Sequence, residues 1–127
     1  MTTLTDIAQR QDLEQIVSRF YHSLLQEESI SYLFTDVARL DLDAHIPVLV
    51  DFWEMVALGT GSYRNNTMAI HQDLHRLSPL SSEHFQTWLL HFRQTVDALF
   101  TGPKAELVKQ RAAQIAQVMQ VRLGIKP

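Results

Sequence analysis

The chain has 127 residues, no cysteine and a formal net charge of −3, from 11 Lys and Arg against 14 Asp and Glu. This length favours one domain spanning residues 1–127, and the small, unclustered charge argues against electrostatic binding to nucleic acid. The lack of cysteine excludes disulfides, thiolate-bound zinc, iron–sulfur clusters and thiol nucleophiles. Because we see neither a signal-peptide pattern nor a membrane-spanning apolar window, we expect a cytoplasmic protein that does not enter the membrane.

The first predicted helix begins at Asp12, which forms a capping-box pattern with Gln15. Its apolar face consists of residues at helical spacing: Leu13, Ile16, Val17, Phe20 and Leu24. Tyr21 lies on the flank of this face, whereas His22 points away from it. The stretch 30–34 then predicts one or two helical turns before a loop.

A second long helix is predicted after Asp41 and Asp43, either of which can cap it. Its apolar face comprises Leu42, His45, Ile46, Leu49, Phe52, Trp53 and Val56. Because Pro47 lacks an amide hydrogen, this helix should begin only a few residues before it or bend there. The glycines and asparagines of 58–67 predict a loop, whose Gly-x-Gly lacks the third glycine and the preceding strand of a nucleotide-binding motif.

A short helix carrying His71 is predicted next, and it ends near Pro79. Ser81 or Ser82 caps the following helix, which has the strongest apolar stripe in the chain: Phe85, Trp88, Leu89, Phe92, Val96, Leu99 and Phe100. The last helix turns Leu107, Val108, Ala112, Ile115 and Met119 towards the core and ends at Gly124. No strand is predicted, so the fold class is all-α.

The six histidines are the main candidates for chemistry, and helical phase separates them. His22, His84 and His91 fall off their apolar stripes or at the margins, whereas His45 and His71 lie on apolar faces. A lone histidine on such a face is more often a hydrogen-bonded core residue than a ligand.

Three interpretations remain open at this point. His71 and His75, at positions i and i+4, can converge on zinc or a di-iron centre, but the H-E-x-x-H and Glu-x-x-His motifs of such sites are missing. A haem needs one neutral imidazole and a mostly apolar pocket, which the aromatic stripes can supply. The third interpretation is a small helical interaction module with structural histidines and no cofactor.

The chain resembles the group III truncated haemoglobins in three stretches: "RFYHSLL", "DAHIPVLVDFWEMVALGTGSYRNNTMAIHQDLH" and "SSEHFQTWLLHFRQTVDALFTGPKAE". The specific marks are the Phe20–Tyr21 pair, His45 ahead of Phe52–Trp53, a Gly-x-Gly-x-Tyr loop, His71 after that loop, and Trp88 in the following helix. The resemblance covers Asp6 to Leu123 and implies a truncated globin, with helices folded two over two.

The resemblance also implies that His71 is the proximal iron ligand of a haem b, with Tyr21, His45 and Trp88 on the distal side. Tyr21 and Trp88 would donate hydrogen bonds to the bound ligand, and His45 would donate one or gate ligand access. The other residues that we expect to line or contact the haem are Phe34, Leu49, Phe52, Trp53, Met68, Leu74, His75, Arg76, Phe92 and Ile115.

Donors beside a ligand that carries partial negative charge slow its release. We therefore expect this protein to bind dioxygen, nitric oxide or another small ligand for redox chemistry, detoxification of nitric oxide or peroxide, or sensing, rather than for oxygen transport. A haem-dependent dioxygenase or peroxidase activity, supplied with electrons by a reductase, would fit this expectation.

Overall fold

The structure, a computed structural model, describes residues 3–39, 41–60, 75 and 78–125. Its elements in chain order are α1 (Arg10–Leu24), α2 (Glu28–Tyr32), the π-helical segment η1 (Leu33–Val37), α3 (Leu42–Leu58), α5 (Ser82–Leu99) and α6 (Pro103–Arg122). The described ranges contain helices and no strand, as the sequence predicts. None of these helices is both long and apolar enough to cross a membrane.

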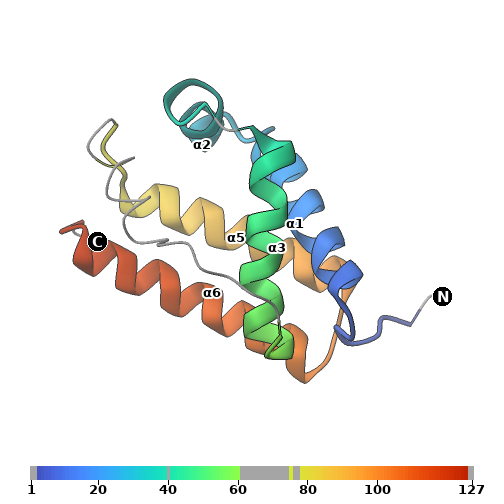
Figure 1. The fold of residues 1–127 in the computed structure, drawn as a ribbon. Helices are drawn as coiled ribbons and strands as arrows, with labels where there is room; N and C mark the ends of the chain where they lie inside the picture. Colours follow the sequence, from blue (N-terminus) through green and yellow to red (C-terminus); the bar gives the residue numbers. More distant parts are fainter. Residues whose placement is uncertain (1–2, 40, 61–74, 76–77, 126–127) are drawn as a thin grey trace.

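The four long helices form two antiparallel pairs that cross each other (Figure 1). Helix α1 lies beside α3, and α5 lies beside α6; in addition, α1 packs on α5 and α3 packs on α6. Because α1 and α3 run in opposite directions, the end of α1 lies near the start of α3. This arrangement can bring Tyr21 and His45 together although they are far apart in the sequence.

The core lies between these helix pairs and uses the apolar faces predicted for α1 and α5. The large side chains that are almost completely buried include Leu13, Ile16, Val17, Leu24, Val50, Phe92, Val96 and Val108. In α6, Val108, Ala112 and Met119 are buried, as predicted. The small residues Ala105 and Ala116, which were not among the predicted core residues, are buried as well. Leu107 and Ile115 are only half-buried. Small side chains thus form much of the face on which α6 contacts its neighbours.

The capping prediction for α1 is wrong, whereas Ser81 caps α5 as predicted. The helix begins at Arg10, because the Asp12 carboxylate reaches back to accept from the N–H groups of Ala8 (2.8 Å) and Gln9 (3.1 Å). Asp41 caps α3 by accepting from the N–H of Asp43 at 3.1 Å, so α3 begins shortly before Pro47.

Asp6 fastens the N-terminal segment to the start of α6. Its carboxylate accepts hydrogen bonds from the N–H groups of Lys104 (3.0 Å), Ala105 (2.9 Å) and its neighbour Ile7 (2.9 Å). Gly102, the residue before α6, has φ 141, and a Cβ there would come within 2.5 Å of the Asp6 carboxyl carbon. A side chain from the opposite end of the chain therefore caps α6 where Gly102 cannot.

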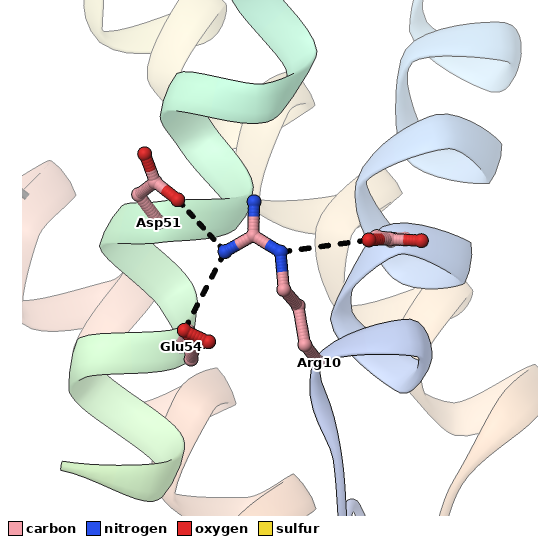
Figure 2. A network of polar contacts seen from close by, with 4 residues as sticks. Arg10, Asp51 and Glu54 are labelled. Carbon is pink, nitrogen blue, oxygen red and sulfur yellow. Dashed lines mark hydrogen bonds and ion pairs between the residues drawn. The ribbon is translucent and has the colours of Figure 1, made fainter. Parts of the chain in front are cut away.

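An ion-pair network joins the start of α1 to the second half of α3 (Figure 2). Arg10 Nη1 lies 2.7 Å from a carboxylate oxygen of Asp51 and 3.4 Å from one of Glu54. Glu54 is 9 % exposed, so its carboxylate depends on Arg10 for charge compensation. The network therefore fixes one end of the α1–α3 pair, and Tyr21 and His45 lie towards the other end.

Candidate functional site

Tyr21 and His45 form a polar pair between α1 and α3. The Tyr21 hydroxyl lies 3.1 Å from His45 Nε2, and the two rings meet edge to face with centroids 5.6 Å apart. Tyr21 is 5 % exposed, whereas His45 is half-buried. Either group can donate this hydrogen bond, depending on the tautomer of the imidazole.

Burial keeps Tyr21 in its protonated form. Loss of solvent raises the pKa of the phenol far above its ordinary value of 10.0. Phe34, from η1, contributes to this environment because its ring lies edge to face against Tyr21 at 5.7 Å. The Tyr21 hydroxyl is therefore available as a hydrogen-bond donor throughout the neutral pH range.

An aromatic cluster lies next to this pair. Phe20 contacts Tyr21 at a centroid distance of 5.4 Å, and it also meets Trp88 at 5.7 Å and Phe92 at 5.4 Å, all edge to face. Phe92 stacks on Trp88 at 5.7 Å and on Trp53 at 4.7 Å. The cluster thus connects α1, α3 and α5, and Phe20 lies between Tyr21 and Trp88.

Several residues that the resemblance assigns to a haem pocket are large, apolar and only half-buried. Phe34, Leu49, Phe52, Trp88 and Ile115 all pack against the core in this way. Partly exposed apolar side chains gain free energy when a large apolar group covers them. Together with the buried donor Tyr21, this chemistry fits a haem, which needs apolar walls and a few polar groups near its iron.

The predicted proximal residues are mostly outside the described part of the chain. Met68, His71, Leu74 and Arg76 fall there, as do the loop from residue 61 onward and the short helix expected around His71. His75 is described, and its Nδ1 accepts a hydrogen bond from the N–H of Leu80 at 2.9 Å. One ring nitrogen of His75 is therefore engaged in holding the backbone. In the ranges that the structure describes, no three His, Asp or Glu side chains are grouped to hold a metal.

His84 and His91 form hydrogen bonds with residues of other helices, and their positions on the predicted helix did not indicate these partners. His84 lies against Tyr32 of α2, and His91 lies against Ser23 of α1. Their spacing with Trp88 places all three on one face of α5, and this spacing is the signal that could have identified them. His22, by contrast, is exposed as predicted.

Comparison with known proteins establishes the family. The sequence model of the family described as "Bacterial-like globin" matches residues 3–121, nearly the whole chain. The chain belongs to the bacterial-like globins. Membership of a globin family implies that the protein binds haem and small diatomic ligands.

Individual relatives agree with this assignment. This globin is 22 % identical over 114 residues to the group 3 truncated hemoglobin ctb of Campylobacter jejuni, an alignment that covers 87 % of each chain. Its structure matches the crystal structure of the group III truncated hemoglobin from Campylobacter jejuni with a TM-score of 0.83, at 22 % identity and over 95 % of each chain. The predicted truncated-globin fold is therefore confirmed.

Proposed function

We propose that this globin forms one domain that binds haem b through His71 and uses Tyr21, His45 and Trp88 to hold a small ligand. The supporting observation is the 3.1 Å contact between the Tyr21 hydroxyl and His45 Nε2 in a largely buried position. Two polar groups that touch each other inside an apolar environment form a localised site for a polar ligand. The proposed distal side of the pocket is this pair.

The haem, when bound, supplies an iron atom to which dioxygen, nitric oxide or another diatomic molecule can attach. Tyr21 donates a hydrogen bond to a ligand that carries partial negative charge, and His45 either orients the Tyr21 hydroxyl or donates a second bond. Trp88 has an indole N–H, and its ring contacts Phe20 and Phe92, neither of which has a side-chain hydrogen-bonding group. It is the remaining candidate donor.

The strength of these hydrogen bonds decides between functions. A hydrogen bond to a charged group contributes about 1.5–3 kcal/mol, so two such donors slow ligand release by several orders of magnitude. Slow release is unsuitable for oxygen delivery. It suits redox chemistry on dioxygen, nitric oxide or peroxide with electrons from a reductase, or ligand sensing, and we place that activity in the cytoplasm.

The remaining pocket residues would line the apolar walls of a haem pocket or surround His71. We assign Phe34, Leu49, Phe52, Trp53, Phe92 and Ile115 to the apolar walls, and Met68, Leu74, His75 and Arg76 to the surroundings of His71. His71 must be unprotonated to bind iron, so acid should release the haem. A helical interaction module without a cofactor would not account for the match to a globin family.

Visible absorption spectra of the purified protein test this proposal. We expect a Soret band, and ferric, ferrous and carbon monoxide forms that report a histidine-ligated haem with a polar distal side. Protein that shows no Soret band after reconstitution with haem would favour the interaction module and contradict the proposal.

A further inference from the structure

Two histidines that the proposed function does not use lie one helical turn on either side of Trp88. His84, Trp88 and His91 occupy positions i, i+4 and i+7 of α5, so they share one helix face. All three side chains are half-buried. Each histidine has its hydrogen-bond partner in or beside a different helix, α2 for His84 and α1 for His91.

His84 joins the start of α5 to α2. Its Nδ1 accepts from the N–H of Ser81 at 3.0 Å, so a neutral imidazole carries its proton on Nε2. Nε2 lies 3.0 Å from the Tyr32 hydroxyl and therefore donates to it. The two rings also meet with centroids 5.9 Å apart. Because the backbone of Ser81 fixes the tautomer, the direction of this interhelical hydrogen bond is also fixed.

His91 joins α5 to the end of α1. Its Nδ1 lies 2.6 Å from Ser23 Oγ, and its Nε2 lies 3.3 Å from a carboxylate oxygen of Glu27. A carboxylate only accepts, so Nε2 carries a proton towards Glu27, and Nδ1 of the neutral ring accepts from the Ser23 hydroxyl. The His91 side chain is only 14 % exposed, which limits competition from water.

Ser23, His91 and Glu27 have the residue types of a serine hydrolase triad, but their location does not support that chemistry. Ser23 lies in the last turn of α1, where the helix presents carbonyl groups and the negative end of its dipole. An oxyanion requires N–H donors and positive potential instead. The trio is therefore better explained by the connection that it makes between helices.

Within the described ranges, the ring contacts of Trp88 are apolar: it lies edge to face with Phe20 and stacks on Phe92. Such contacts tolerate sliding and rotation of a helix more readily than hydrogen bonds do, because they are less directional. We propose that His84 and His91 are positioning residues that clamp the Trp88 turn of α5 against α2 and α1. This clamp sets the place of the Trp88 indole relative to Tyr21. Its consequence for ligand binding rests on the proposed function.

The test removes the partner hydroxyls and leaves the histidines in place. Ser23→Ala and Tyr32→Phe, singly and combined, delete one hydrogen bond each with almost no change in volume. Ser23→Thr keeps a hydroxyl and serves as the conservative rescue. Ser18→Ala, at an exposed serine on the same helix, is the matched control. Circular dichroism verifies that every variant is folded.

The first measurement uses the haem-free protein. The chain has two tryptophans and therefore two indole N–H resonances, which a Trp53→Phe variant assigns. We expect the Trp88 resonance to shift and broaden in Ser23→Ala and in Tyr32→Phe, and most in the double variant. Ser23→Thr and Ser18→Ala should leave it near its original position. An unchanged Trp88 resonance in the folded double variant would overturn the clamp.

The second measurement uses the haem-loaded protein. We expect the double variant to release dioxygen about threefold to tenfold faster, the range for a weakened hydrogen bond, and its carbon monoxide complex to show a shifted C–O stretching frequency. A shifted indole resonance with unchanged ligand kinetics would support the clamp and contradict Trp88 as a donor. Failure to bind haem would contradict the proposed function, while the first measurement would still decide on the clamp.

Discussion

The Tyr21 hydroxyl and His45 Nε2 lie 3.1 Å apart because α1 and α3 are antiparallel, which places the end of one helix beside the start of the other. Tyr21 is almost fully buried, and its hydroxyl forms a hydrogen bond with this imidazole. The two side chains therefore act as one unit, in which a change to either alters the hydrogen bonding of the other.

Removing the Tyr21 hydroxyl should weaken ligand retention. In Tyr21→Phe we expect the dioxygen dissociation rate to rise about tenfold or more, because a hydrogen bond to a partly charged ligand is lost. Stopped-flow displacement of dioxygen by carbon monoxide measures this rate. His22→Gln, which changes an exposed neighbour on the same helix, should keep the original rate. If Tyr21→Phe releases dioxygen at the unaltered rate, Tyr21 is not the main donor.

Tyr21 should also make the fold sensitive to alkali. Burial raises the pKa of its phenol in the folded state, so above pH 10.0 the unfolded chain loses this proton first. The stability that depends on the protonated phenol is thus complete below that pH and falls as the pH rises above it. We expect urea denaturation to show a steeper alkaline loss for the unmodified protein than for Tyr21→Phe. Tyr32→Phe, which retains Tyr21, should keep the steep loss, and equal slopes in all three would refute this assignment.

Asp6 should stabilise the fold and add an acid-sensitive component. Burial opposes ionisation of its carboxyl, but hydrogen bonds from Lys104, Ala105 and Ile7 outweigh that effect and lower its pKa below 3.8. This contribution is present above pH 3.8 and is lost as the pH falls through the folded-state pKa. Asp6→Ala should cost about 1–2 kcal/mol in the free energy of unfolding at pH 7, as for a helix cap.

Chemical denaturation at pH 7 and at about pH 3 checks the Asp6 prediction. The difference between Asp6→Ala and the unmodified protein should shrink at the lower pH. Asp36→Ala, at an exposed aspartate whose side chain accepts a hydrogen bond from its neighbour Thr35, is the control and should change little. A stability of Asp6→Ala equal to that of the unmodified protein at pH 7 would show that another group caps α6.

Helical periodicity predicted the buried faces of α1 and α5 because these faces depend only on spacing within one helix. Periodicity could not predict helix caps that come from residues far away in the sequence. Asp6 caps α6 from the other end of the chain, and no local pattern around Gly102 indicates this. Likewise, Asp12 and Gln15 have the pattern of a capping box, but the chain before them folds back so that the N–H groups of Ala8 and Gln9 donate to the Asp12 carboxylate.

The residues of the candidate site were predicted mainly from the resemblance to the group III truncated haemoglobins, and less from their positions on the predicted helices. Phase placed His45 on an apolar face but could not say that it meets Tyr21, since that contact depends on how α1 and α3 pack. Helical phase placed His84 and His91 off the apolar stripe of their helix or at its margin, because it compares a residue only with the other residues of the same helix. Their partners, Tyr32 and Ser23, belong to other elements, so only the packed structure indicates a role for them.

The central claim is that His71 holds a haem opposite Tyr21 and His45, and the absorption spectrum of a His71→Gly variant tests it most directly. We predict that this variant, expressed and reconstituted like the unmodified protein, loses the stable Soret band and regains it when free imidazole is added. His22→Gly, which removes an exposed histidine, should keep the band without imidazole. A stable Soret band in His71→Gly without imidazole, identical to that of the unmodified protein, would contradict the account.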